Sequence, residues 1–346
     1  MQARVAHGIL AAAILAAGLG GLYAFHRALT PHRRPRVETA KPADIVRIGY
    51  FANITHAVPL LGLADGDFAR ALGPGVRLER VEFGAGPSAV EALFAGSIDM
   101  AYVGPNPALN AHLRSRGEVK VIAGAARGGA ALVVRRGVGS AAEIRRLATP
   151  QLGNTQDVAA RAWLRAQGLL DVKVIPLRPP DQLTALVKGE IDAAWTVEPW
   201  VSRLVLDAGG RVLVDERDLW PDGRFPTTLL VAGRRFVEAN PDLVRRWLRA
   251  HVEVVGRLQS SPDARARVNA ELGRLVGKPL SEGVLREAFG RMEPTWDPLP
   301  AALRQNARQA FELDYLDKVP PDVENLFDLA PLERVLREAG LPPLAR

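Results

Sequence analysis

Polar residues able to bind an anion follow three stretches with strand character, each at the expected start of a helix. The first loop contains Asn53, Thr55 and His56, the second is Gly84–Ser88, and the third is Asn154–Asp157. Backbone N–H groups at a helix start lack intrahelical partners and lie at the positive end of the helix dipole. Such positions are suited to oxyanions.

Hydroxyl and amide side chains in these loops can add further donors to such a site: Thr55, Ser88, Asn154 and Thr155. The same residue types also cap helices, and for one loop alone capping is the simpler interpretation. Three such loops converging on one cleft favour a ligand site. We interpret His56 as a hydrogen-bond donor at a helix start and not as a base.

A second group of candidate residues consists of Trp195, Glu198 and Trp200. We predict that Trp195 forms an apolar wall of the site, against an alkyl chain or a ring. Glu198 either accepts a hydrogen bond from a ligand ammonium group or complements the dipole of the following helix. Trp200 is predicted to pack inward.

Residue patterns typical of catalysis are absent from the sequence. The chain has no Cys, which excludes a thiolate nucleophile, a disulfide and a Cys-ligated metal. The six His show no metal-binding spacing, and neither a GxSxG elbow nor a GxxxxGK[ST] loop is present. We therefore predict a non-catalytic protein without a metal or cofactor.

The length and composition indicate a globular protein with two lobes. The chain has 346 residues, of which 48% are hydrophobic and 24% charged. Its net charge is +7, but the basic residues are dispersed and no aromatic–basic cluster accompanies them. Nucleic acid is therefore not the predicted partner.

The N-terminus has the character of an export signal. An apolar run, Gly8–Phe25, follows Arg4 and His7 and precedes the basic, Pro-rich segment Thr30–Pro42. We assign residues 1–29 to a signal peptide or membrane anchor and 30–43 to a linker, with the folded part outside the membrane. The sequence leaves open whether the segment is removed or tethers the protein.

One pattern occurs twice, 93 positions apart, in Pro87–Tyr102 and Pro180–Trp195. Each copy has Pro, a capping residue (Ser88 or Asp181), a short apolar helix, Gly, and then Ile-Asp-x-Ala-aromatic. The Gly residues are expected to end their helices in the left-handed conformation. Each copy is thus half of a βαβ unit, and the repeat predicts two similar lobes. We expect its two Asp residues to be structural.

Strands and helices alternate along the chain, which predicts an α/β fold. The expected strands are Ile45–Tyr50, Leu78–Phe83, Ile98–Tyr102, Val119–Ala123, Ala131–Arg135, Val172–Leu177, Ile191–Trp195, Arg211–Asp215 and Thr227–Ala232. After Arg234 the pattern is helical. We assign residues 44–125 and 225–346 to lobe 1, including a helical tail, and 126–224 to lobe 2.

Four motifs resemble the substrate-binding proteins of ABC importers for nitrate, sulfonate, taurine and bicarbonate. They are IGYFANITHA (Ile48–Ala57), YVGPNPA (Tyr102–Ala108), GNTQDV (Gly153–Val158) and EPW (Glu198–Trp200). The resemblance covers about residues 44–257. It implies a type II periplasmic-binding-protein fold, with two α/β lobes, two crossovers and a hinge that closes on a small ligand.

The resemblance also implies which residues line the cleft: Asn53, Thr55, Ser88, Gly104, Asn106, Thr155 and Gln156. The chain departs from relatives at Arg127, where they often have a small residue. This Arg either adds positive charge to the cleft or points to solvent.

The leading hypothesis is a monomeric, periplasmic binding protein that passes a small anion to an ABC permease. Aliphatic sulfonate or taurine is favoured, followed by nitrate or bicarbonate. The alternatives are a binder of a pyrimidine thiamine precursor, a membrane-tethered ligand sensor, and an enzyme similar to thiamine-pyrimidine synthases. The lack of Cys disfavours the enzyme.

Overall fold

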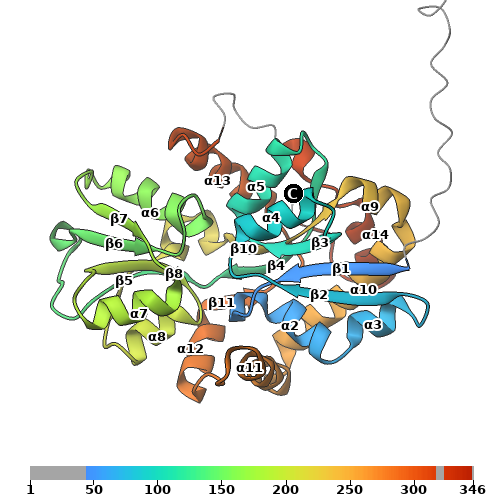
Figure 1. Ribbon diagram of the computed structural model, residues 1–346, viewed down its shortest axis with the longest axis horizontal. Helices are drawn as coiled ribbons and strands as arrows, with labels where there is room; N and C mark the ends of the chain where they lie inside the picture. The colour runs from blue at the N-terminus through green and yellow to red at the C-terminus, as the bar shows by residue number, and fades with distance from the viewer. Residues whose placement is uncertain (1–43, 317–322, 345–346) are drawn as a thin grey trace, which may run out of the picture. The chain divides into compact units, whose positions relative to one another are not determined.

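The computed structural model describes residues 44–316 and 323–344, so the predicted N-terminal segment and linker (1–43) lie outside it. Two β-sheets carry the fold, and Figure 1 shows them with helices on both faces. Within the described ranges, no helix is long and apolar enough to span a membrane.

The first sheet has six strands in the order β11-β4-β10-β3-β1-β2, with β10 antiparallel to both of its neighbours. Their bounds are β1 Ile45–Tyr50, β2 Arg77–Glu82, β3 Met100–Val103, β4 Val119–Gly128, β10 Pro226–Gly233 and β11 Met292–Pro294. Helices α2 (Ala57–Ala64), α3 (Asp67–Leu72) and α10 (Pro241–Ser260) share one core with this sheet. Helices α4 (Gly86–Phe94), α5 (Pro105–Arg114) and α13 (Pro300–Glu312) share the other.

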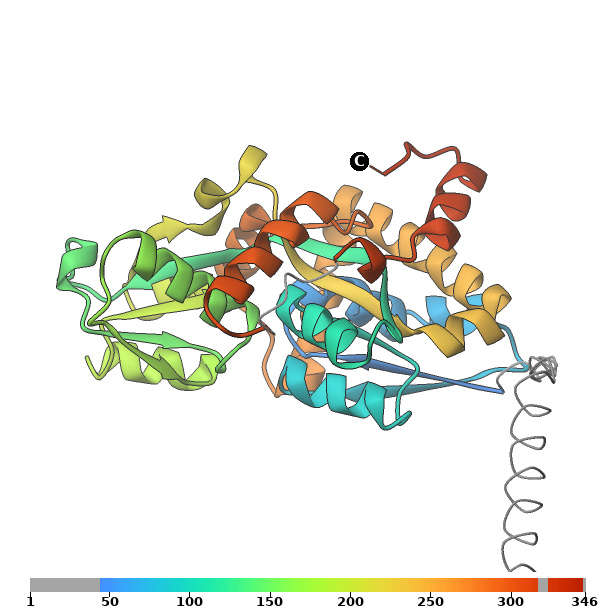
Figure 2. The same ribbon diagram turned by 90° about the horizontal axis from the view of Figure 1, so that it is seen from above.

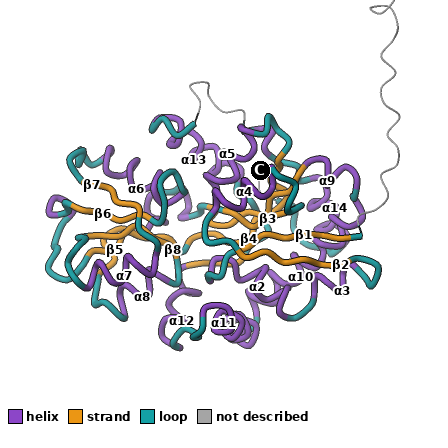
Figure 3. The backbone as a smooth tube through the Cα atoms, in the orientation of Figure 1, coloured by secondary structure: helices purple, strands orange, loops and turns teal. Residues whose placement is uncertain are grey.

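The second sheet has five strands in the order β7-β6-β8-β5-β9. They are β5 Ala130–Val134, β6 Arg146–Thr149, β7 Lys173–Pro176, β8 Ala193–Val197 and β9 Arg211–Asp215. Helix α6 (Thr155–Ala166) covers one face, and α7 (Pro179–Val187) and α8 (Trp200–Leu206) cover the other. We call the first sheet with its helices lobe 1 and the second lobe 2; the tube in Figure 3 shows both.

The repeat noticed in the sequence is also a repeat in the structure. Asp99 accepts from the backbone N–H of Arg47 at 2.7 Å, and Asp192 accepts from that of Arg146 at 2.9 Å. Each Asp stands just before β3 or β8, and each partner lies in the neighbouring parallel strand, β1 or β6. Both carboxylates therefore fix strand pairing, as expected of structural residues.

The helix ends of the repeat agree with the sequence, but the helix starts do not. Gly96 and Gly189 have φ values of 67° and 69°, the predicted left-handed conformation. The predicted caps, however, are wrong. The helices begin at Gly86 and Pro179, two residues before the predicted caps. Ser88 and Asp181 therefore lie inside the first turn. Ser88 Oγ donates back to the carbonyl of Ala85 at 2.8 Å.

The chain changes sheet after β4 and again before β10. β4 continues past residue 125 to Gly128 before the chain enters β5 in the other sheet. The return, predicted near 225, is followed at once by β10, which starts at Pro226. The short strands β6 and β11 were not predicted, because neither shows an alternating pattern.

The C-terminal tail contacts both lobes. Its remaining helices are α9 Arg234–Ala239, α11 Pro262–Val276, α12 Glu282–Arg291 and α14 Ala330–Glu338. Helix α12 packs against α8, and α13 packs against α5 and α6. Figure 2 shows α13 over the boundary between the lobes. Tyr315, after α13, donates to Asp157 Oδ2 in α6 at 2.6 Å. The tail was expected on lobe 1 alone.

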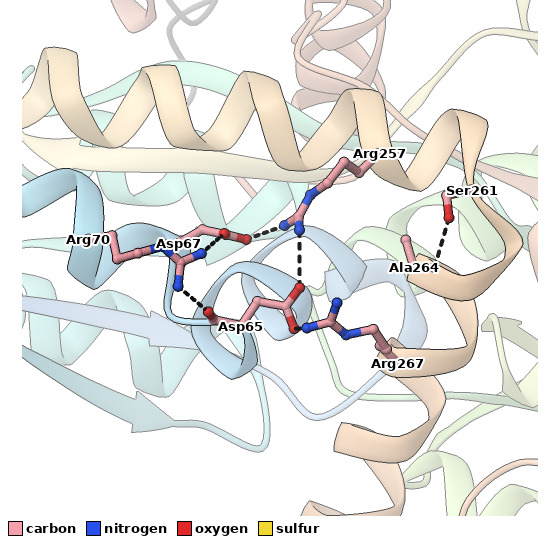
Figure 4. A network of polar contacts seen from close by, with 7 residues as sticks. All are labelled: Asp65, Asp67, Arg70, Arg257, Ser261, Ala264 and Arg267. Atoms are coloured by element: carbon pink, nitrogen blue, oxygen red, sulfur yellow. Dashed lines mark hydrogen bonds and ion pairs between the residues drawn. The ribbon is translucent and has the colours of Figure 1, made fainter.

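An ion network joins the tail to the start of lobe 1 (Figure 4). The Asp65 carboxylate, whose side chain is only 6% exposed, pairs with Arg257 at 3.2 Å and with Arg267. Asp67 pairs with Arg257 and with Arg70. The network ties α10 and α11 to the α2–α3 turn.

We predict that Asp65→Asn lowers the free energy of unfolding by roughly 1–2 kcal/mol, because two guanidinium groups lose a shielded charged partner. Urea denaturation at low salt would measure this. The exposed Asp171 provides the control, Asp171→Asn, which should leave the midpoint unchanged. Equal stability of the two variants would contradict a structural role for the network.

Candidate ligand-binding site

A cavity of about 990 Å³ lies between the lobes. Lobe 1 lines it with the segments that follow β1, β2 and β3, and lobe 2 with those that follow β6, β7 and β8. These are the carboxyl ends of the parallel strands, where open α/β sheets bind ligands. A third wall, Leu272–Val284, comes from the end of α11 and the start of α12.

The two lobes meet where α5 and α6 begin. The backbone N–H of Asn106 donates to Thr155 Oγ1 at 3.3 Å. At Gly104, an added Cβ would stand 2.8 Å from the same oxygen, so only glycine permits this approach. We call Gly104 and Thr155 the junction of the cavity; both line it.

The first predicted loop contributes a side-chain amide and an imidazole. Asn53 Oδ1 accepts from the backbone N–H and the hydroxyl of Thr55, at 2.8 and 2.6 Å. Thr55 lines the cavity, but its hydroxyl proton is directed to Asn53. The donor that remains is Nδ2 of Asn53, another lining residue.

His56 lines the cavity as a neutral donor. Its Nδ1 accepts from the backbone N–H of Phe51 at 3.3 Å, so the proton of the neutral ring is on Nε2. Burial lowers the pKa of His56 to about 3. The imidazole therefore stays uncharged at neutral pH, with its Nε2 proton available for a hydrogen bond.

The third predicted loop opens α6 toward the cavity. Asn154 caps the helix by accepting from the backbone N–H of Asp157 at 2.9 Å, as capping predicts. Its Nδ2 donates to Gln156 Oε1 at 3.3 Å, which leaves Nε2 of Gln156 as a donor. The backbone N–H groups of Thr155 and Gln156 have no carbonyl partner within the helix. The positive end of α6 thus presents several donors.

Three predicted positions do not line the cavity, and the assignments of Trp195 and Glu198 were wrong. Trp195 is fully buried in lobe 2, where Nε1 donates to Glu216 Oε2 at 2.8 Å. Glu198 is also buried; it accepts from the backbone N–H and the hydroxyl of Ser202 at 3.1 and 2.9 Å. It is thus an acceptor for the first turn of α8, the alternative considered for it. Asn106 has no exposed surface.

Trp200 lines the cavity, contrary to the prediction that it packs inward. The guanidinium of Arg203 lies 4.7 Å from the centre of its ring and pairs with Asp207 at 3.0 Å. Sequence reasoning also missed Gln151, whose buried Oε1 has no partner among the described residues, and the Leu272–Val284 wall.

Two further residues that raised questions in the sequence are engaged elsewhere. Arg127 Nε donates to Glu293 at 3.1 Å, and β4 pairs with β11 there. It does not line the cavity described above. Ser88 lines it, but its hydroxyl proton is already donated to Ala85. Among the side chains that line the cavity near the junction, the uncommitted donors are neutral: Asn53, His56, Thr155 and Gln156. Asn106 Nδ2 beside them also has no partner among the described residues, but Asn106 has no exposed surface.

Two of the solved structures with the same arrangement are binding proteins. The alkanesulfonate-binding protein from Xanthomonas axonopodis pv. citri, bound to MOPS, aligns with a TM-score of 0.70 and 23% identity, over 84% of this chain and 100% of its own. The nitrate-binding protein from Synechocystis PCC 6803 aligns with a TM-score of 0.73 and 15% identity, over 87% and 90%. The chain thus has the predicted fold of two-lobed periplasmic binding proteins.

The sequence comparisons identify the family. The NMT1-like family model matches residues 39–272, and the chain belongs to this family. The taurine-binding periplasmic protein of Escherichia coli (strain K12) is 27% identical over 225 residues, which are 62% of this chain and 68% of that protein. These named relatives are binding proteins and not enzymes, in agreement with the non-catalytic prediction.

The buried Glu216 gives a prediction about pH. Burial raises the pKa of Glu216 to about 7, so the folded state keeps a proton that the unfolded state loses near pH 4.5. This glutamate therefore stabilises the fold below pH 4.5, and its contribution, about 3 kcal/mol, is lost as pH rises to 7. Glu216→Gln keeps an acceptor for Trp195 but does not titrate.

We expect the unfolding free energy of Glu216→Gln, relative to wild type, to rise by about 3 kcal/mol between pH 4.5 and 8. Burial also lowers the pKa of His56 to about 3 and of His251 to about 4, so these two residues make the fold more stable as the pH rises. Their effect is the same in the variant and in the wild type, and it cancels when the two unfolding free energies are subtracted. Denaturant titrations along a pH series would measure it. The exposed Glu253 supplies the control Glu253→Gln, and parallel behaviour of both variants would refute the assignment.

Proposed function

We propose that this protein is the substrate-binding component of an ABC importer, which captures a small oxyanion between its lobes and delivers it to the permease. Aliphatic sulfonate or taurine is the favoured ligand, followed by nitrate or bicarbonate. The named relatives bind taurine, alkanesulfonate or nitrate. We further propose that it acts in the periplasm as a monomer. An uncleaved N-terminal tether remains a prediction, because residues 1–43 lie outside the part of the chain that the structure describes.

The observation that carries this proposal is the set of neutral donors at the junction. Asn53 and His56 come from lobe 1, and Thr155 and Gln156 come from the positive end of α6 in lobe 2. An anion that accepts from both sets binds the closed protein better than the open one. Binding then shifts the population toward closure, the state that would deliver the ligand.

The types of hydrogen-bonding group favour an anion without a proton of its own. Asn53 Oδ1 already accepts twice, and Gln156 Oε1 accepts from Asn154. A sulfonate or nitrate needs only donors, whereas bicarbonate carries an O–H that needs a buried acceptor. Gln151 Oε1, which is buried and has no partner among the described residues, is one candidate for that acceptor.

The proposal predicts a selective thermal shift. Purified protein would be heated with taurine, short alkanesulfonates, nitrate, bicarbonate, alkylphosphonates and hydroxymethylpyrimidines. A true ligand at 100 times its Kd should stabilise by about 2.7 kcal/mol. We expect the response from sulfonates. A response to a pyrimidine alone would instead support the thiamine-precursor alternative, because Trp200 lines the cavity and its ring can stack on a pyrimidine.

Thr155 offers a direct test of the junction. Thr155→Ala removes a hydroxyl that bridges the lobes and can donate to the anion, so we expect an affinity loss of about tenfold or more. Titration calorimetry with the best ligand of the panel would measure it. The exposed Thr184, on α7, supplies the matched control Thr184→Ala. Unchanged affinity in Thr155→Ala would remove this residue from the site.

A further inference from the structure

A second, smaller cavity, which we call the distal hollow, lies at the opposite end of lobe 1 from the cavity between the lobes. Its volume is about 400 Å³, and the two cavities share no lining residue. The hollow forms where β10 ends and β4 begins, beside the C-terminal end of α5. This is the amino end of the parallel strands. Figure 1 shows α9, which starts at the hollow, at the end of lobe 1 that is remote from lobe 2.

The described residues that line the distal hollow include three cations, Arg116, Lys120 and Arg234, and no carboxylate. Arg234 is neutralised by its neighbours, because it pairs with Glu118 at 2.5 Å and with Glu238 at 3.7 Å.

The other two cations have no such counter-charge. The Arg116 guanidinium makes no hydrogen bond or ion pair with a described residue, and its side chain is exposed. The Lys120 amine donates to the backbone carbonyl of Asn325 and has no carboxylate partner in the described part of the chain. Neighbouring positive charges repel each other, so an anion that binds both is stabilised by both.

Lys120 lies over the turn that carries Arg116. A Cβ added at Gly117 would stand 4.0 Å from Nζ of Lys120 and 3.7 Å from the His112 ring. That ring is held by the contact of its Nδ1 with the carbonyl of Val119 at 2.9 Å. The amine is thus beside the residue that follows Arg116, against a fixed imidazole wall.

The backbone at Arg116 shows that this side chain is not there to end the helix. Arg116 has φ of 52° and stands two residues after the last residue of α5. A side chain at such a left-handed position destabilises the fold relative to glycine. After α13 the position is held by Asp, which tolerates this conformation better. After α4, α6, α7 and α14 it is held by glycine, with φ between 67° and 69°: Gly96, Gly168, Gly189 and Gly340.

We propose that the distal hollow binds a phosphate group, with Arg116 and Lys120 as its cationic ligands. A guanidinium donates to phosphate oxygens in pairs and an ammonium acts as a point charge, so together they match a dianion. The volume of about 400 Å³ leaves room for the group that carries the phosphate. The phosphate belongs either to a free anion or to a phospholipid headgroup. This site is separate from anion capture between the lobes and does not depend on it.

Phosphate binding by the full chain tests the proposal. Titration calorimetry at constant ionic strength would use inorganic phosphate and glycerol 1-phosphate. Sedimentation would compare phosphatidylcholine vesicles with and without phosphatidylglycerol, so that any contribution of the apolar run near the N-terminus is the same in both. We expect at least one of these probes to bind, and Arg116→Gln and Lys120→Gln each to weaken it about tenfold or more. A response to the free anions assigns a soluble ligand, and a response to phosphatidylglycerol alone assigns the headgroup.

Arg235 supplies the matched control. It lies beside Arg234 with its side chain 91% exposed, pairs with Glu118 at 3.5 Å and does not line the hollow. Arg235→Gln removes the same charge as Arg116→Gln, and we expect it to change phosphate affinity by less than about twofold.

Arg116→Gly separates binding from a structural role. Without phosphate it should raise the melting temperature by about 2 °C, because glycine suits the left-handed position. It should also abolish the response to phosphate. Unchanged phosphate binding in Arg116→Gly, or no binding of any probe by the wild type, would overturn the proposal. Loss of phosphate binding in Thr155→Ala would also overturn it, because the phosphate would then occupy the cavity between the lobes.

Discussion

The close contact between the backbone of lobe 1 and the first turn of α6 is the constraint on which the site depends. Thr155 Oγ1 lies against Gly104 and accepts from the backbone of Asn106, so the two helix starts face one space. A side chain at residue 104 would push them apart. The backbone thus fixes the position around which the side-chain donors lie. Little reorganisation is therefore needed when a ligand binds.

The charge distribution follows from the same geometry. His56 is kept neutral by burial, with a pKa lowered to about 3, and its proton is placed on Nε2 by the backbone of Phe51. Among the described residues, three cationic side chains line the cavity. Arg203 is paired with Asp207, Arg178 is paired with Asp181 at 2.9 Å, and Lys278 belongs to the Leu272–Val284 wall and not to the junction. An anion at the junction would thus be stabilised mainly by hydrogen bonds and the α6 dipole.

Sequence reasoning found the parts of the fold that depend on local periodicity. β1, Ile45–Tyr50, and α2, Ala57–Ala64, were predicted with their observed bounds because their patterns and flanking residues agree. The loops with Asn53, His56 and Thr155 were found for a similar reason, since helix starts have recognisable residue types.

The errors concern side-chain direction and long-range packing. Trp195 lies within β8, and the face to which a strand residue points is set by the register of the whole sheet. Trp200, five residues later, reaches the cavity because it opens a helix after the strand has ended. The Leu272–Val284 wall was not foreseeable, because only the packing of the tail brings it to the cavity.

The tail makes ligand affinity sensitive to residues far from the ligand. Arg291, at the end of α12, lies 3.4 Å from Glu198 in lobe 2, and Tyr315 bonds to Asp157 in α6. Any rotation of one lobe against the other must carry these contacts along or break them. Apparent affinity scales with the fraction of protein already able to bind. Substitutions in the tail can therefore retune the working concentration range of the protein, while the residues that choose the ligand stay the same.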